Sequence, residues 1–372
     1  MIISGRAGDG SCGVGDHSFF LARELSKKVE VYLLFRSGRG PRDEYSKLLP
    51  ERNLKLVDVP AFSSSAISRV LKLIKDISPT VVHLQYPARE FRLSPFPLLL
   101  SSAVSHLPDI HLAITLHEYL SSHLLRKIMS FFICSKAKLI IVPSLASFNA
   151  IKRKFPTRAV QIPDGAYFPL FTEARMPDFS LNPTRETRVL SFGLPSKTKR
   201  LLELVSLIAD LRKVRELDDL NLTLIGYRQR DVNATALRDR NLGFVSFLPY
   251  QEVESLADIA QKSLLIVFPF NFDTHRSSLI NSLALPAPIY CFGIEDAVLK
   301  EKIQPLPLHS NDPGYEANLA TLRDYLLSLK RNFKEIGASV LSQQRILLER
   351  FRIDRIANDH LDAYNNLLTR KA

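Results

Sequence analysis

Short apolar runs rich in β-branched and aromatic residues alternate with amphipathic stretches along residues 1–163. Strands of this kind, separated by helical segments, are typical of parallel α/β layers, in which each strand is buried on both faces. Amphipathic helices are expected between the strands, for example over residues 16–27 and 64–76. We predict seven strands, at residues 1–4, 29–35, 54–59, 81–86, 111–117, 139–144 and 159–163.

The alternation stops at residues 164–187, which are rich in Pro, Phe and polar residues and have no period. We interpret this stretch as a linker between two domains. Alternation then resumes, and the region from residue 315 onward is helical by period and long enough to pack across both domains. Five more strands are predicted, at residues 188–193, 220–226, 244–249, 264–270 and 287–293.

These patterns predict an α/β protein with two doubly wound, Rossmann-like domains and a cleft between them. A chain of 372 residues is too long for one core of ordinary size, which also favours two domains. We place the domains at residues 1–170 and 171–350, with a final helix at 351–372 that packs back on the first domain. In such sheets ligands bind beyond the carboxyl ends of the strands, so the residues that follow each strand are the candidates for function.

The cysteines and the apolar runs indicate the cellular compartment of the protein. Three cysteines without a CxxC pair form neither a disulfide framework nor a zinc site, which is typical of a reducing compartment. No apolar run approaches the roughly 18 residues of a membrane span, and the first residues lack the pattern of a signal peptide. We therefore expect a soluble, cytoplasmic protein.

A formal net charge of +12 indicates an anionic partner. The sequence contains no DNA- or RNA-reading module and no basic stripe interleaved with aromatic residues, so we expect no nucleic-acid partner. Basic residues cluster at 124–138 and 152–158. Two interpretations stay open at this point: solvated helix faces, or a patch that contacts anionic lipid at the inner face of a membrane.

The loop after the first predicted strand contains the string Gly8-Asp9-Gly10-Ser11-Cys12-Gly13, which matches GxGxxG. A site for NAD also needs an acidic residue at the end of the second strand, to bind the ribose. That strand ends in Phe35 and Arg36, and its acid, Glu30, lies near its beginning. The glycine string is therefore weak evidence, and its context argues against NAD.

Several strand ends form an ordered series of motifs that runs through nearly the whole chain. The series begins with CGVGDHS and continues with VVHLQY, ITLHEY, the stretch from VPSLASFNAIKRKF to VQIPDGAYF, VLSFGLPSKTKR, LTLIGYR and LLIVFPFNFDTHRSSL. In this order the segments resemble motifs of the family-4 retaining glycosyltransferases, which have GT-B architecture, and CGVGDHS resembles the glycine loop of that family. The last segment of the series resembles a branch of the family with an RSSL-type donor segment.

The resemblance implies a nucleotide-sugar donor whose diphosphate is held by backbone N–H groups and cations. Gly13 and Gly15 would form the glycine loop, although a tight turn that packs helix on strand is the alternative. Lys199 matches the phosphate lysine, whereas the arginine usual after Gly193 is Leu194 here. The substitute would come from three consecutive residues, Arg276, Ser277 and Ser278, unless Ser277 only caps a helix and Arg276 is solvated.

Other site residues follow from the same resemblance. His117 would contact the donor sugar, whereas His83 is expected to be structural or on the acceptor side. Asp273 and Asn281 stand where the family usually has two glutamates, which bind the sugar and the ribose; we assign Asp273, with His117, to catalysis. Gly226 and Leu248 would flank the ribose and base.

The implied reaction moves a hexose from a nucleoside-diphosphate sugar, with a UDP-sugar such as UDP-glucose favoured over a GDP-sugar. The acceptor would be a hydroxyl of a glycan or a lipid-linked molecule, as in polysaccharide or glycolipid biosynthesis. We expect no metal and no cofactor, because no DxD pair stands at a strand end and Lys199 and Arg276 would replace a cation. No protein nucleophile is evident, which favours attack from the same face as the departing phosphate.

Two functions of other classes remain as alternatives. A catalytically silent GT-B subunit that binds a partner would account for Leu194 and Asn281, which depart from the family pattern. A nucleotide-dependent oxidoreductase or sugar-nucleotide epimerase would use the opening loop. The missing acid at the end of the second strand counts against that last function.

Overall fold

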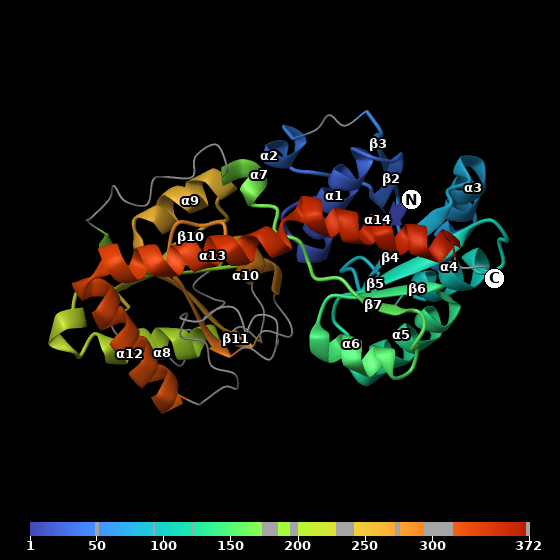
Figure 1. Cartoon of the computed structure of the whole chain (residues 1–372). Coiled ribbons are helices and arrows are strands. Elements are labelled where there is room, and N and C mark those ends of the chain that lie inside the picture. Colours follow the sequence, from blue (N-terminus) through green and yellow to red (C-terminus); the bar gives the residue numbers. More distant parts are fainter. Residues whose placement is uncertain are drawn as a thin grey trace. The chain divides into compact units, whose positions relative to one another are not determined.

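The computed structural model describes residues 1–48, 52–91, 94–120, 122–172, 185–193, 200–227, 242–271, 276–293 and 315–369. The chain forms two compact units (Figure 1): Met1–Gly165 together with Phe351–Ala372, and Ala166–Arg350. All twelve predicted strands are confirmed, because seven lie in the first sheet and five in the second. The linker predicted at residues 164–187 lies partly outside the described residues.

The N-terminal unit is built on a fully parallel sheet with the order β3-β2-β1-β4-β5-β6-β7. Strand β1 lies between β2 and β4, so the chain order reverses at that point, which is where doubly wound sheets bind ligands. The strands are β1 (Ile2–Ile3), β2 (Val31–Arg36), β3 (Leu54–Val59), β4 (Val81–Tyr86), β5 (His111–Leu116), β6 (Leu139–Val142) and β7 (Ala159–Gln161).

Helices cover both faces of this sheet. One face carries the larger apolar core with α3 (Ile67–Ile77), α4 (Phe96–Val104), α5 (Leu124–Lys136) and α6 (Leu145–Lys152). Helices α1 (Gly13–Ser26) and α14 (Ile353–Thr369) contact each other, and α14 packs against β6 in a separate cluster (Figure 1). The C-terminal helix thus packs on the N-terminal unit. The short elements are α2 (Asp43–Ser46) and a 3-10 turn at Ser64–Ala66.

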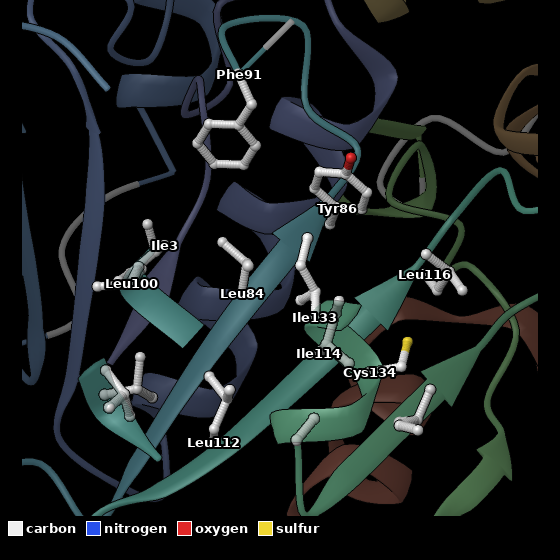
Figure 2. Close-up of a cluster of buried hydrophobic side chains, with 14 of the residues drawn as sticks. Ile3, Leu84, Tyr86, Phe91, Leu100, Leu112, Ile114, Leu116, Ile133 and Cys134 are labelled. Atoms are coloured by element: carbon white, nitrogen blue, oxygen red, sulfur yellow. The ribbon is translucent and has the colours of Figure 1, made fainter. Parts of the chain in front are cut away.

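Alternation along β4 and β5 separates an apolar face from a polar one. Leu84 and Tyr86 of β4 and Leu112, Ile114 and Leu116 of β5 point into the larger core (Figure 2). Successive side chains of a strand point to opposite faces, so the polar residues between them face the other way. The polar set, all buried or nearly so, is His83, Gln85, Thr115 and, directly after β5, His117.

The C-terminal unit has its own parallel sheet with the order β10-β9-β8-β11-β12. Its strands are β8 (Glu186–Phe192), β9 (Asn221–Ile225), β10 (Val245–Leu248), β11 (Ser263–Asn271) and β12 (Ile289–Gly293). Helices α8 (Leu201–Leu211) and α12 (Tyr315–Arg331) pack on its apolar core. The other described helices are α7 (Pro169–Thr172), α9 (Val253–Gln261), α10 (Arg276–Ser282) and α13 (Ala338–Phe351), with short turns at Arg215–Leu217 and Phe333–Gly337.

None of the helices in the described ranges combines the length and the apolar character needed to cross a bilayer.

The two units have the same construction, which is a parallel sheet covered by helices. The sheet of the N-terminal unit is the larger one.

Candidate active site

His117 is held at the carboxyl end of β5 by three contacts within the N-terminal unit. Its backbone N–H donates to the carbonyl oxygen of Tyr86 (2.9 Å), which aligns the ends of β4 and β5. Its ring Nε2 lies 2.8 Å from Oε1 of Gln85, and its Nδ1 lies 3.3 Å from Oδ1 of Asp164. The imidazole is 6% exposed, so both ring nitrogens are fixed by the protein in this structure.

The partners of His117 determine where its proton lies. The Gln85 carbonyl oxygen faces Nε2 and can accept a hydrogen bond only when that nitrogen carries the proton, because an amide oxygen only accepts. A neutral imidazole has one N–H, so Gln85 and Asp164 compete for the same proton. A sugar hydroxyl that reaches either nitrogen would replace one of these two partners.

Three further histidines pack behind His117 in a buried polar layer. The ring centroids of His17 and His117 are 5.6 Å apart, those of His17 and His360 are 6.4 Å apart, and those of His83 and His360 are 5.8 Å apart. Burial lowers the pKa of His17 to about 3 and that of His360 to about 4. Burial also lowers the pKa of His83 well below its ordinary value. These three rings are therefore neutral at physiological pH.

Helix α14 supplies part of this layer. The Tyr364 hydroxyl lies 2.6 Å from Nδ1 of His83, and Thr115 Oγ1 lies 2.7 Å from its Nε2. His360 lies four residues before Tyr364, hence on the same face of the helix. Its Nδ1 lies 2.8 Å from the carbonyl oxygen of Ile356. The His83 side chain is therefore a structural link between β4, β5 and α14, in agreement with its expected role.

The glycine loop has its left-handed residues earlier than the sequence suggests. Gly8 and Gly10 both have φ +68°, a conformation that side chains rarely adopt, so both need to be glycine. Gly13 begins α1, and Gly15 lies inside it. A Cβ on Gly15 would be 2.7 Å from Cβ of Arg6, so this glycine permits close packing of helix on loop. Contact of Gly13 and Gly15 with a donor stays a prediction.

Buried charged side chains stabilise this loop through ion pairs and a hydrogen bond. The Arg6 guanidinium, itself buried, pairs with Asp9 (2.6 Å) and Glu90 (2.7 Å). Asp16 Oδ1 accepts the backbone N–H of Gly10 (3.0 Å), and burial raises the pKa of Asp16 to about 7. Asp16 thus closes the turn between Gly10 and α1, a role that the sequence motif alone did not indicate.

Three predicted residues of the C-terminal unit meet at neighbouring strand ends. The backbone N–H of Gly193 donates to the carbonyl oxygen of Ile225 (3.2 Å), and that of Gly226 donates to the carbonyl oxygen of Leu248 (3.0 Å). Gly193 has φ +138° and Gly226 has φ +81°. A Cβ on Gly226 would lie 2.8 Å from the carbonyl oxygen of Gly193, so the two backbones touch where any side chain would intrude.

The Asn281 side chain forms hydrogen bonds with the backbone of its own unit. It is 1% exposed, and its Oδ1 accepts the N–H groups of Tyr167 (2.8 Å) and Phe168 (3.0 Å). Its Nδ2 donates to the carbonyl oxygen of Ser277 (2.9 Å). Asn281 therefore holds the chain that leads into α7, and a direct contact with ribose stays a prediction. Ser277 and Ser278 lie half-buried in the first turn of α10.

Several predicted residues lie outside what the structure describes. Lys199 and Asp273 fall in undescribed segments, as does Leu194, and Arg276 begins α10 but its side chain is not described. In the described part of the chain, no cluster of three or more histidine, cysteine or acidic side chains could hold a metal ion.

Comparison with known protein families gives a match for the part of the chain that holds His117. Residues 12–166 match the model of Glycosyltransferase Family 4, and these residues contain the glycine loop, His117 and Asp164. The match places the N-terminal unit in this family and leaves the C-terminal unit outside the matched residues. A search among curated protein sequences gives no match for this chain.

Solved structures show that the whole chain has the GT-B fold of known glycosyltransferases. A glycosyltransferase from Rickettsia africae ESF-5 is 15% identical, with a TM-score of 0.70 over 100% of this chain and 98% of that one. WaaG, a glycosyltransferase involved in lipopolysaccharide biosynthesis, is 11% identical, with a TM-score of 0.67 over 97% and 99%. An alpha-glucosyltransferase in complex with UDP-glucose and DNA is 12% identical, with a TM-score of 0.66 over 99% and 98%.

The partners of His117 were not found from the sequence. Gln85 follows the period-2 pattern of residues 81–86, so its place on the polar face could have been inferred. Asp164 is the first residue of the predicted linker, and no local pattern points it toward His117. The tyrosine and histidine of α14 carry no signal at all, because their partners are far away in the sequence.

Proposed function

We propose that the protein transfers a hexose, with retention of configuration, from a UDP-sugar such as UDP-glucose to a hydroxyl of a glycan or lipid-linked acceptor. The observation that carries the proposal is the family match over residues 12–166, which contain His117 at a strand end. Two similar folds support the finer points: one was solved with UDP-glucose, and the other takes part in lipopolysaccharide biosynthesis. We place the reaction accordingly in polysaccharide or glycolipid biosynthesis.

The proposed chemistry is stabilisation of a departing diphosphate. As the bond between the anomeric carbon and the phosphate oxygen breaks, negative charge builds on that oxygen, and fixed cations and N–H groups lower the barrier. Lys199 and Arg276, with the hydroxyls of Ser277 and Ser278, supply this charge in our proposal, without a metal. The departing oxygen then takes the proton of the acceptor hydroxyl, which attacks from the same face.

His117 orients the donor sugar in this proposal. Its ring is already fixed between Gln85 and Asp164, so it loses little conformational freedom when a sugar binds. Gly13 and Gly15 let the donor approach the start of α1, and Gly193, Gly226 and Leu248 leave room for the nucleotide at the ends of β8, β9 and β10. Asp273 accepts hydrogen bonds from the sugar hydroxyls.

The test is release of UDP or GDP from a panel of nucleotide sugars, measured with the purified full chain. We expect turnover with a UDP-sugar and a loss of at least about 100-fold in kcat/KM for Lys199→Ala. Lys213→Ala is the matched control, because Lys213 also lies in the C-terminal unit but its side chain is 78% exposed. Absence of turnover and of binding with every UDP- and GDP-sugar would refute the proposal.

Asn281 favours the second candidate, a catalytically silent GT-B subunit. Because its amide already satisfies Tyr167, Phe168 and Ser277, it has no acceptor left for a ribose hydroxyl unless those bonds rearrange. The two candidates differ in one measurement. Transfer activity that disappears in Lys199→Ala but persists in Lys213→Ala excludes a silent subunit.

A further inference from the structure

Helix α5 exposes its apolar side chains to solvent. Five residues form what we name the apolar α5 face: Leu124 (74% exposed), Leu125 (51%), Ile128 (45%), Phe131 (42%) and Phe132 (51%). Their spacing of i, i+1, i+4, i+7 and i+8 puts them on one side of the helix. Among the described residues, they are five of the eleven large hydrophobic side chains that are exposed.

The opposite side of α5 is already packed. Ser130, Ile133 and Cys134 are buried, and Figure 2 shows Ile133 and Cys134 in the apolar core of the N-terminal unit. The helix is therefore fixed to its unit and cannot turn its apolar face inward. A contiguous apolar surface on a soluble domain is typical of a contact site.

The charge around this face has one sign. Between Glu118 and Asp164 the sequence contains no acidic residue and eight basic ones: Arg126, Lys127, Lys136, Lys138, Lys152, Arg153, Lys154 and Arg158. Lys136 and Lys138 are exposed at the end of α5, and Lys154 Nζ lies 5.7 Å from the ring centroid of Phe131. The basic groups thus border the apolar side chains.

We propose that the apolar α5 face docks on an anionic lipid surface. Leucine, isoleucine and phenylalanine side chains enter the boundary between headgroups and acyl chains, while the bordering lysines meet the lipid phosphates. A planar surface suits this helix, because a partner that encloses a helix would need the side that Ile133 and Cys134 occupy. The inference goes beyond the proposed function, since lipid docking requires no sugar donor.

Vesicle flotation with the full chain tests this proposal without any donor. Vesicles contain phosphatidylcholine alone or mixed with phosphatidylglycerol. We expect the protein to float with the anionic vesicles, and more weakly at high salt, because surface charges are screened. A protein that stays at the bottom of the gradient with anionic vesicles at low salt would overturn the proposal.

The variant Leu124→Gln/Leu125→Gln/Phe132→Gln removes apolar groups that are at least half exposed, so the fold should be unaffected. We expect vesicle partitioning to fall at least about tenfold, with an unchanged circular dichroism spectrum and Tm. Ile346→Gln in α13 is the matched control, because Ile346 is 67% exposed and lies in the other unit. If the triple variant does not fold, Phe132→Gln alone is scored in the same way.

A separate variant tests the charges. Lys136→Gln/Lys138→Gln is expected to weaken binding to anionic vesicles by about fivefold for each charge removed. If the charge variant loses vesicle binding but the triple variant binds vesicles as well as the wild type does, the proposed contact of the apolar α5 face with lipid is wrong. A protein that is dimeric by light scattering, becomes monomeric in the triple variant and never floats would assign this face to a second copy instead.

Discussion

The strand ends of the two units present different kinds of surface. In the N-terminal unit, β4 and β5 end in hydrogen-bonding side chains, with His117 held by Gln85 and Asp164. In the C-terminal unit, β8 and β9 end in Gly193 and Gly226, whose backbones touch. One unit thus offers oriented side chains, and the other offers half-buried backbone without Cβ atoms.

This difference shows how one sheet topology can serve two tasks. The side-chain surface depends on the protonation of buried histidines, so it is sensitive to pH. The backbone surface depends on the absence of Cβ atoms, so it is sensitive to any larger residue. Each dependence gives experiments that affect one unit and spare the other.

Acid is expected to have the largest effect, and to act on the N-terminal unit. The folded-state pKa values of His17 and His360, about 3 and about 4, lie below the ordinary value of 6.5. Their contribution to stability is full above pH 6.5 and is lost as the pH falls toward those values. The loss approaches about 1.4 kcal/mol for each histidine and pH unit.

Hydrogen exchange measured between pH 7 and pH 4.5 and corrected for intrinsic rates would follow this loss separately in each unit. We expect amides of β4, β5 and α14 to lose protection first, because these elements pack around the buried neutral histidines. Protonation of Asp16, whose pKa burial raises to about 7, stabilises the folded unit as the pH falls and offsets part of this loss. The described part of the C-terminal unit contains no histidine and serves as the internal control. Equal loss of protection in both units would contradict the assignment.

Gly226→Ala is expected to have the next largest effect, in the C-terminal unit. The new Cβ would meet the Gly193 carbonyl oxygen at 2.8 Å, and φ would stay at +81°. We expect the free energy of unfolding to fall by about 3 kcal/mol in urea titrations, of which the backbone conformation accounts for about 1 kcal/mol. Gly38→Ala is the control, because Gly38 has φ +71° and open space around it. Equal losses in both variants would show that the close approach is unimportant.

Tyr364→Phe is expected to have a smaller effect on stability, in the N-terminal unit. It removes the hydroxyl that lies 2.6 Å from Nδ1 of the buried His83 and leaves that nitrogen without this partner. We expect a loss of about 1–2 kcal/mol in thermal or urea unfolding. An unchanged free energy of unfolding in Tyr364→Phe would mean that the packing of α14 does not depend on this hydrogen bond.

Gln85→Leu is expected to have the smallest effect on free energy, and it acts on turnover. The variant removes the acceptor that faces Nε2 of His117, so the ring proton can move to the side of Asp164. We expect kcat to fall about tenfold with little change in KM, because the orientation of the ring is lost and not the binding of the nucleotide. Tyr364→Phe, which alters the same layer without touching His117, should keep its kcat. A change in KM alone would give Gln85 a different role.

The fold was predictable from the sequence to a large extent, because buried parallel strands leave a local pattern. All twelve strands follow from apolar runs and their spacing. The residues around the site were less predictable, since Tyr364 and His83 are 281 positions apart and no local pattern joins them. Asn281 likewise reaches Tyr167 over 114 positions.

The glycine loop shows a subtler limit of sequence reasoning. The motif drew attention to Gly13 and Gly15, whereas the left-handed backbone is at Gly8 and Gly10. A spacing pattern shows that glycines are present, but not which of them turn the chain and which make room for a neighbour. Only the position of Arg6 next to Gly15 separates these two roles.

Time-resolved proton NMR of donor cleavage tests the proposed function most directly. UDP-glucose is incubated with the full chain, and water serves as the acceptor, so no natural acceptor is needed. We predict that α-glucose forms first and β-glucose appears only by later mutarotation, and that Lys199→Ala abolishes both. First appearance of β-glucose, or cleavage that is unchanged in Lys199→Ala, would contradict a retaining transfer that depends on Lys199.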